Sequence, residues 1–407
     1  MIFVYLRQEN LPLRRNLAQR RISAGIQLFF SYHAHSLTHA GPAPPGGTRT
    51  NDRVKRLCAL LREKELDAVF ISNESNVRYL SGYTNHDAFL FIAANGDRRL
   101  ITDFRYDEQA RSECPDYQVM SFVKGKSGIF QLLDQSCAEN GVKKLGFEAA
   151  AISHASYLLL TDTVKGVAVE DCGPLVEGLR YVKDDREEAL IRYACAATDR
   201  VFSKLCEYIR PGLTEKQLEW QLLTFVNEEG CDSSFQPIVV AGEHGSLPHG
   251  MAGERKLRNG EFLTMDFGCM YQGYHADMTR TVFLGRPDPK QKDVYSIVLE
   301  AHLRGMDAFK AGVTGSVPDA AARDYITEKG YGENFGHGVG HGLGLDIHED
   351  PFMGRLCQRV LEEGCFVTME PGIYLPGWGG VRIEDTVKIT RDGCESLFTS
   401  EKGLICL

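Results

Sequence analysis

The sequence lacks any long apolar run and any excess of positive charge. Its longest uninterrupted apolar segment, residues 88–94, has seven residues, whereas a transmembrane helix needs about 20. The 407 residues carry 46 Lys and Arg against 55 Asp and Glu, a net charge of −9, whereas nucleic-acid-binding proteins usually have a basic surface. We therefore expect a protein that neither crosses a membrane nor binds nucleic acid.

Closely spaced cysteines are also missing. The twelve cysteines stand at least eight positions apart, so no CxxC motif for metal binding or redox chemistry is present. Several lie in apolar segments, for example Cys58 and Cys195, where a free thiol behaves as a small apolar side chain. This pattern favours a reducing, intracellular environment without a disulfide framework, and we expect a cytoplasmic protein.

Residues 1–50 differ in composition from the rest of the chain. They contain six arginines, no lysine and one acid, Glu9, so their net charge is +5 and that of the remaining chain is −14. Such a basic start is typical of an organellar transit peptide, which would place the protein in an organelle. It also fits an upstream extension read from a misplaced start codon. In either case, we expect residues 1–50 to be disordered and to carry no catalytic group.

A smaller α/β domain is expected at residues 52–178. The apolar segment 67–72 predicts a buried strand. Two further apolar segments flank Asn95-Gly96, which is a strong signal for a β-hairpin. Strands that alternate with helical patterns on this scale are typical of an α/β domain.

An α+β domain is expected at residues 183–407, because helices there alternate with glycine-rich, strand-like segments. A charged segment predicts the start of a long helix, and a capping box at Thr214 predicts a second helix that ends at Gly230. The helical segments are expected to begin at 183–188 and 214–217 and to cover 290–309 and 318–329.

Two aspartates, Asp266 and Asp277, are placed symmetrically about a predicted turn. The midpoint between them falls at residues 271–273, a sequence that fits a hairpin turn. Antiparallel strands would then bring the two carboxylates to within about 5 Å at Cβ. Two acids in apolar strands are costly unless they are paired or bound to a metal ion.

Two glutamates, Glu370 and Glu384, repeat this arrangement about Gly377. A solvated edge strand or an ordinary salt bridge explains one such pair. Two pairs in one domain favour a cation site.

Three histidines lie in or near a run of alternating glycines. Glycines at every second position from 336 to 344 surround His337 and His341, and His348 follows. This spacing predicts an extended backbone that neighbouring segments approach closely, with His337 and His341 on one face. Four carboxylates and one imidazole are donors suited to two divalent ions, for which we expect Mn²⁺, while Co²⁺ or Zn²⁺ would fit the same donors. Two such ions would share a bridging hydroxide at neutral pH.

The order of these motifs resembles that of the pita-bread metallopeptidases (family M24), which include methionyl aminopeptidase, Xaa-Pro aminopeptidase, prolidase and creatinase. The resemblance extends over residues 52–407. It implies a pita-bread catalytic domain at 183–407, preceded by a creatinase-type N-terminal domain at 52–178. The motifs that carry it are Leu247-Pro-His-Gly250, Met265-Asp-Phe-Gly268, Ala276-Asp-Met-Thr-Arg280, His337 to Glu349, Met369-Glu-Pro-Gly372 and Arg382-Ile-Glu-Asp385.

The resemblance also implies roles for single residues. His249 would contact the substrate, and His348 would stabilise the tetrahedral intermediate. His337 is typical of the proline-specific branch, as is the segment 76–82. Glu370 is our candidate general base, Arg382 would hold a ligand carboxylate, and Tyr374 would approach the site from the Glu370 strand. The implied metal ligands are Asp266, Asp277, His341, Glu370 and Glu384, of which Asp277 and Glu384 would bridge both ions.

The proline-specific branch cleaves the bond between an N-terminal residue and proline, a tertiary amide without an N–H. We therefore expect an Xaa-Pro aminopeptidase that acts on peptides with proline at the second position. An Xaa-Pro dipeptidase (prolidase) of the same fold is the alternative. A creatinase-like enzyme without metal and a catalytically inactive binding module fit five intact ligands less well. The resemblance further implies a homodimer.

Overall fold

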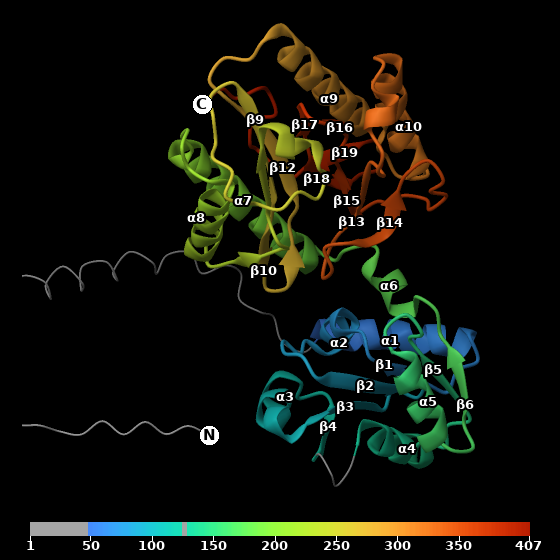
Figure 1. The fold of residues 1–407 in the computed structure, drawn as a ribbon. Coiled ribbons are helices and arrows are strands. Elements are labelled where there is room, and N and C mark those ends of the chain that lie inside the picture. Colours follow the sequence, from blue (N-terminus) through green and yellow to red (C-terminus); the bar gives the residue numbers. More distant parts are fainter. Residues whose placement is uncertain (1–47, 124–127) are drawn as a thin grey trace, which may run out of the picture. The chain divides into compact units, whose positions relative to one another are not determined.

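The computed structural model describes residues 48–123 and 128–407 (Figure 1). Of the leader expected at residues 1–50, residues 1–47 lie outside this part of the chain. The first helix, α1 (Thr48–Glu63), begins before Asp52, where the sequence pattern predicts regular structure to start. Within the described residues, no helix is both long enough and apolar enough to cross a bilayer.

The N-terminal part is built around a six-stranded mixed sheet with the strand order β4-β3-β2-β1-β5-β6. The strand predicted at 67–72 is β1, which is buried throughout and lies between antiparallel β2 and parallel β5. The predicted hairpin joins β2 to β3, and Gly96 in its turn has a φ of +98°, which glycine adopts without strain. The strands are β1 (Ala68–Ile71), β2 (Ala88–Ala93), β3 (Arg98–Asp103), β4 (Gln118–Phe122), β5 (Lys144–Phe147) and β6 (Ala168–Asp171).

Helices connect these strands, as expected for an α/β arrangement. In α1, Val54, Leu57 and Leu61 recur at helical spacing and are buried in the core. The other helices of this part are α2 (Glu74–Ser81), α3 (Asp107–Glu113), α4 (Ile129–Glu139), α5 (His154–Thr163) and α6 (Leu175–Arg180), with a short 3-10 turn η1 (Phe104–Tyr106) before α3.

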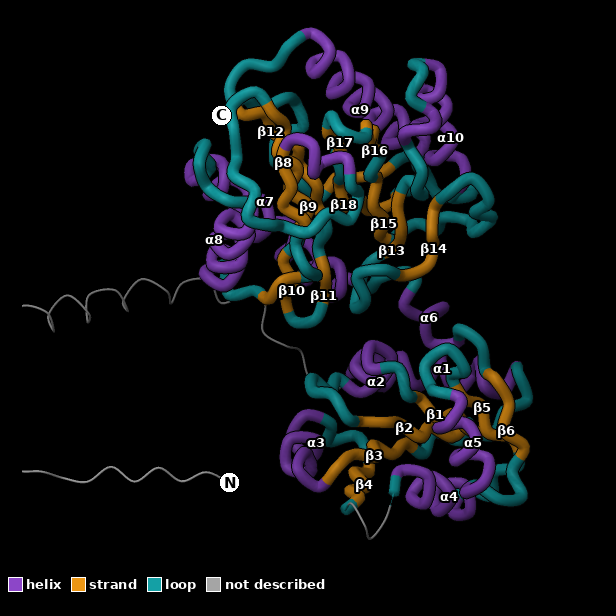
Figure 2. The backbone as a smooth tube through the Cα atoms, viewed as in Figure 1, coloured by secondary structure: helices purple, strands orange, loops and turns teal. Residues whose placement is uncertain are grey.

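The C-terminal part contains the four predicted helices (Figure 2). The predicted capping box is present at the start of α8, where Thr214 pairs with Gln217. Helix α7 also starts with a capping box, in which Asp184 pairs with Glu187. Helix α7 packs against α8, and α9 packs against α10. The helices are α7 (Asp185–Tyr208), α8 (Glu215–Glu228), α9 (Pro289–Ala308) and α10 (Ser316–Glu328).

Small antiparallel sheets fill the space between these helices. Their strand orders are β12-β9-β8, β11-β10-β7, β14-β13-β15-β18-β19 and the two-stranded β16-β17. The strands are β7 (Asp232–Ser233), β8 (Ile238–Ala241), β9 (Glu261–Phe267), β10 (Cys269–Tyr271), β11 (Tyr274–His275), β12 (Met278–Leu284), β13 (Gly340–Gly342), β14 (Glu349–Met353), β15 (Phe366–Met369), β16 (Gly372–Leu375), β17 (Gly379–Arg382), β18 (Asp385–Ile389) and β19 (Cys394–Ser396); short 3-10 turns are η2 (Gly242–Ser246) and η3 (Gly332–Asn334).

The turn between the two aspartates lies one residue later than the symmetric placement predicts. Asp266 in β9 lies opposite Thr279 in β12, not opposite Asp277, so the predicted direct pairing is wrong. The turn falls on Gln272 and Gly273, whose φ values of +48° and +82° suit a two-residue hairpin. Asp277 is thus a diagonal neighbour of Asp266, two residues from its direct partner, and both carboxylates still reach the same face of the sheet.

The register predicted for the two glutamates about Gly377 is confirmed. The ladders β16-β17 and β15-β18 share one register, and Gly377 sits in the turn with a φ of +72°. The two strands separate between these ladders. Glu370 donates its backbone N–H to Val339 O at 2.8 Å, and Glu384 donates its own to Thr279 O at 3.1 Å. Each glutamate therefore leaves the hairpin for a different neighbouring strand or loop.

Candidate active site

One cavity of about 410 Å³ brings together the side chains that the sequence singles out. Asp266 lies within β9, Asp277 directly precedes β12, and His341 lies within β13. The remaining two acids stand where the hairpin strands separate. The lining includes all five predicted ligands, Asp266, Asp277, His341, Glu370 and Glu384, together with His249, His337, His348 and Arg382.

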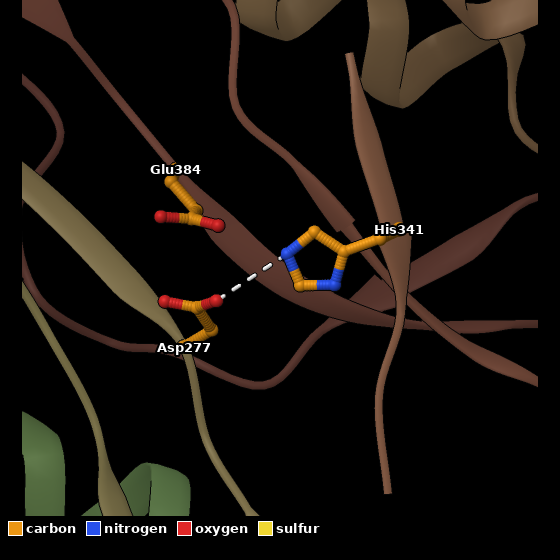
Figure 3. Close-up of side chains that lie close together, drawn as sticks. All are labelled: Asp277, His341 and Glu384. Carbon is orange, nitrogen blue, oxygen red and sulfur yellow. Dashed lines mark ion pairs between the residues drawn. The ribbon is translucent and has the colours of Figure 1, made fainter. Parts of the chain in front are cut away.

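Three of these side chains form a tight group, which Figure 3 shows in close-up. Potential ligand atoms of Asp277, His341 and Glu384 all lie within 4.8 Å of one another. His341 Nε2 is 3.5 Å from Asp277 Oδ2 and 3.6 Å from Glu370 Oε1. Its Nδ1 lies 3.0 Å from the carbonyl oxygen of Gly342 and therefore donates to it. In the neutral ring, the lone pair of Nε2 then faces the carboxylates, an arrangement that a cation between them would stabilise.

Burial and mutual repulsion dominate the electrostatics of the acids. The side chains of Asp277 and Glu384 are buried, which raises the pKa of both carboxyl groups well above the ordinary range. Neighbouring acids raise these pKa values further, Asp266 for Asp277 and Asp277 for Glu384. Among the described residues, Asp266 Oδ1 and Asp277 Oδ1 are buried without a hydrogen-bond partner. The donor set therefore fits divalent cations, which supply the missing positive charge and accept oxygen lone pairs.

Two further side chains orient two of the acids through hydrogen bonds. Arg382 donates from Nη2 to Asp266 Oδ2 at 2.6 Å. Thr279 donates from Oγ1 to Glu384 Oε2 at 2.7 Å. These bonds engage one oxygen of each carboxylate and leave the other free to face the cavity. Burial raises the pKa of Asp266, while the guanidinium of Arg382 opposes that rise.

A chain of hydrogen bonds connects His337 to Arg382 through Tyr374. The hydroxyl of Tyr374 accepts from Arg382 Nη1 at 2.8 Å and lies 2.9 Å from His337 Nε2. His337 Nδ1 lies 2.8 Å from Gly338 O, so Nδ1 donates there and Nε2 accepts from the tyrosine. Tyr374 thus sits behind the cavity wall and fixes the ring of His337.

His348, another histidine of the cavity lining, lies beside His341. The ring centroids of His341 and His348 are 4.3 Å apart, with an interplanar angle of 63°. Burial lowers the pKa of His348, and the nearby His341 lowers it further. Burial likewise lowers the pKa of His337. Both rings are therefore neutral near pH 7, and His348 can donate or accept a hydrogen bond to a bound substrate. Both nitrogens of His337 are already bonded, to Gly338 and to Tyr374.

Close backbone contacts explain three of the alternating glycines. A Cβ on Gly338 would lie 2.3 Å from Met353 O, and one on Gly340 would lie 2.2 Å from Thr368 O. A Cβ on Gly342 would lie 2.5 Å from Asp350 O. Gly336, in contrast, has open space at this position. The predicted close approach is confirmed around His341, where it seats β13 between β14 and β15.

The apolar side of the cavity has no counterpart in the sequence-based prediction. Residues before and at the start of β8 and around β14 form it, and all of them except Ile347 lie outside the motifs. Phe352 alternates with buried residues in β14 and is 63% exposed, so the pattern marks it as an ordinary surface position. The apolar lining residues are Phe235, Ile238, Ile347, Phe352 and Met353.

Buried carboxylates around one imidazole, with further histidines beside an open cavity, are typical of metal-dependent hydrolases. Comparison with known proteins identifies the particular family. Residues 189–391 match the metallopeptidase family M24, and residues 53–182 match the creatinase/prolidase N-terminal domain. The chain belongs to metallopeptidase family M24, and it has the pita-bread fold behind a creatinase-type N-terminal domain.

Several relatives share nearly their whole length with this chain. An Xaa-Pro dipeptidase from Bacillus anthracis superposes with a TM-score of 0.84 at 40% identity, covering 88% of this chain and 100% of that one. An X-Pro aminopeptidase from Thermotoga maritima gives a TM-score of 0.81 at 35% identity, covering 87% and 99%. An Xaa-Pro dipeptidase from Pyrococcus horikoshii is 33% identical over 360 residues, covering 87% and 99%.

Proposed function

We propose that the protein is a metal-dependent Xaa-Pro dipeptidase, which hydrolyses the amide bond between an N-terminal residue and a C-terminal proline. The single observation that carries this proposal is the cavity that gathers four acids, His341 and three further histidines in a chain related to Xaa-Pro dipeptidases. The sequence alone favours an aminopeptidase, whereas the relatives shift the preference to the dipeptidase alternative.

Five residues would hold two divalent cations, for which we propose Mn²⁺. Bound cations supply Lewis acidity, which polarises the scissile carbonyl and makes water more acidic. The fit rests on the unpartnered buried oxygens of Asp266 and Asp277 and on the His341 lone pair that faces acids. The proposed ligands are Asp266, Asp277, His341, Glu370 and Glu384.

The remaining polar groups of the cavity would bind the substrate and move protons. Glu370 would take a proton from the attacking water and pass it to the proline nitrogen as the amide bond breaks. His348 and His249 would donate hydrogen bonds to the scissile carbonyl oxygen and to the peptide. His337 is held rigid by Tyr374, so it would present a fixed edge to the substrate.

The apolar side of the cavity would accept the proline ring. Proline has no backbone N–H to recognise, so its ring must be bound by shape and apolar contact. Phe235, Ile238 and Phe352 are apolar side chains of the cavity lining, in contrast to the acids that also line it. They would also exclude water from the bond that is cleaved.

An Xaa-Pro aminopeptidase is the second candidate. It is favoured by the Thermotoga maritima structure, which is an X-Pro aminopeptidase. The two activities share the same bond and the same chemistry. They differ in whether residues after proline are accepted.

Product analysis with Ala-Pro and Ala-Pro-Ala tests the proposal. Each peptide is incubated with protein that has been stripped with a chelator and with protein to which Mn²⁺ has been restored. We expect metal-dependent release of alanine from Ala-Pro and none from Ala-Pro-Ala. Release from Ala-Pro-Ala would instead support the aminopeptidase, and cleavage of neither peptide by metal-loaded protein would overturn both candidates.

A further inference from the structure

One buried carboxylate holds both ends of the segment that carries His249. Glu215, the first residue of α8, is fully buried. Its Oε1 accepts a hydrogen bond from the backbone N–H of Ala241 at 2.8 Å, and its Oε2 accepts one from that of Gly253 at 3.1 Å. Ala241 and Gly253 are the two ends of the segment 241–253, and His249 lies between them.

The same carboxylate also contacts the middle of this segment. His244 Nδ1 lies 3.1 Å from one oxygen of Glu215 and 3.2 Å from the other. His244 belongs to η2, which packs backbone to backbone on β17, because a Cβ on Gly380 would lie only 2.0 Å from Gly245 O. Strand β17 ends with Arg382. The contact of Glu215 with His244 therefore holds the segment against the strand that carries Arg382.

Hydrogen bonds within the segment also fix the backbone on either side of His249. Leu247 donates its N–H to His244 O at 3.1 Å, and Gly250 donates to Leu247 O at 3.0 Å. Pro248 O accepts from Arg382 Nη1 at 3.3 Å. The position of His249 beside the cavity thus follows from where the ends and the middle of the segment are held.

We propose that Glu215 is a positioning residue, whose carboxylate holds residues 241–253 in the conformation that presents His249 to the substrate. This inference rests on the proposed function, in which His249 contacts the peptide. A carboxylate suits the place because all three groups that it meets can donate, so a side-chain amide would set an N–H against one of them. The first turn of α8 also favours a negative charge there.

A double-mutant cycle between Glu215 and His249 tests the proposal. For Glu215→Gln, we expect kcat/KM for Ala-Pro to fall by about tenfold to a hundredfold, since a buried donor loses its acceptor, while bound Mn²⁺ is unchanged. In the His249→Ala background, the same change should cost less than about twofold, because residues that act together are not additive. Hydrogen–deuterium exchange of 242–252 should be faster in Glu215→Gln, with or without metal.

A second variant and a matched control sharpen the test. His244→Ala keeps both backbone contacts of Glu215 and should show a smaller loss, again only when His249 is present. This variant serves where Glu215→Gln folds poorly. Asp67→Asn removes another carboxylate that accepts two backbone N–H groups, those of Lys143 and Lys144, but it lies in the N-terminal domain outside the cavity lining. It should retain the wild-type kcat/KM.

Two results would overturn the inference. One is an equal loss for Glu215→Gln with and without His249, and the other is unchanged exchange of 242–252. Failure of the proposed function is a separate outcome, in which the wild-type protein cleaves no Xaa-Pro peptide. In that case the exchange experiment alone decides, because it needs no substrate: faster exchange supports the role of Glu215, and unchanged exchange rejects it.

Discussion

At the scale of single residues, the site gathers buried acidic side chains, and the basic side chains around them offset little of this negative charge. Arg382 bonds to Asp266, whereas Asp277 and Glu384 face each other and His341 in a buried group. Without a metal ion, these acids destabilise the fold, because burial and then repulsion between the acids raise the pKa values of Asp277 and Glu384. The proposed metal ligands are therefore also the residues that weaken the metal-free protein.

Asp277→Asn tests this directly. We expect the affinity for Mn²⁺ to fall by more than about a hundredfold, and activity to fall with it. This loss is larger than that usually caused by substituting a residue that only orients a ligand. The metal-free variant should melt at the same temperature as metal-free wild type or higher, since one buried charge is gone. Metal analysis after dialysis and thermal unfolding followed by circular dichroism check both points. Wild-type activity in this variant would mean that Asp277 is not a ligand.

His337→Ala separates substrate contact from metal binding. His337 bonds to Tyr374 and to the carbonyl oxygen of Gly338, neither of which is a proposed metal ligand. We expect Mn²⁺ content to stay at the wild-type level and kcat to fall by about tenfold to a hundredfold, in the range typical of a lost acid–base or positioning group. Tyr374→Phe removes the hydrogen bond that fixes the His337 ring but keeps the imidazole itself, so it should give a smaller loss of kcat. Loss of metal from His337→Ala would show that its role has been confused with that of His341.

At the scale of elements, the glycines around β13 let three strands meet at His341, a proposed metal ligand. A Cβ on Gly340 would collide with the backbone oxygen of Thr368, which cannot move aside as a flexible side chain would. We expect Gly340→Ala to lower the free energy of unfolding by about 1–3 kcal/mol, the usual cost of overpacking, and to weaken metal binding. Gly336→Ala is the matched control, since nothing lies near its Cβ. Urea unfolding of both variants checks the difference, and equal stabilities would contradict it.

The sequence predicts elements and pairs well where one local signal decides, and poorly where distant segments meet. The register about Gly377 is predictable because the midpoint of the two glutamates coincides with the glycine that forms the turn. The register between Asp266 and Asp277 is missed by two residues because the turn needs two positive φ angles, at Gln272 and Gly273, which symmetry alone does not locate. The apolar lining, such as Phe352, comes from loops and strands whose approach is set by tertiary packing, so no local pattern marks it.

At the scale of the whole molecule, a buried ion-pair network ties α6 and the following segment to the loop that carries His348. Arg180 donates to Asp346 Oδ2 at 2.7 Å and also contacts Glu349. Lys183 lies 3.1 Å from Glu349 Oε2. Burial alone would raise the pKa of Glu349, but Lys183 and Arg180 lower it to about 2. One carboxylate thus joins segments that are far apart in sequence.

This network predicts a loss of stability in acid. Because the folded pKa of Glu349 is lower than its unfolded value, ionised Glu349 stabilises the fold above about pH 4.5. That contribution should disappear as the pH falls from about 4.5 to 2. Glu349→Gln should be less stable at pH 7 and should show a flatter stability profile over that interval, as measured by urea unfolding at a series of pH values. A profile parallel to that of the wild type would exclude the assigned role.

The separation of the hairpin strands at Glu370 and Glu384 has a consequence for the order of events in folding. The backbone N–H groups of these two residues bond to Val339 and Thr279, outside the hairpin, and the proposed ligands Asp266 and His341 lie in two different sheets. The complete donor set therefore exists only after separate sheets have docked, and we expect this docking to come late in folding. We expect added Mn²⁺ to slow unfolding and to leave the refolding rate unchanged, because a contact absent from the transition state acts on unfolding alone. Stopped-flow measurements would show this as a shift in only one arm of the chevron.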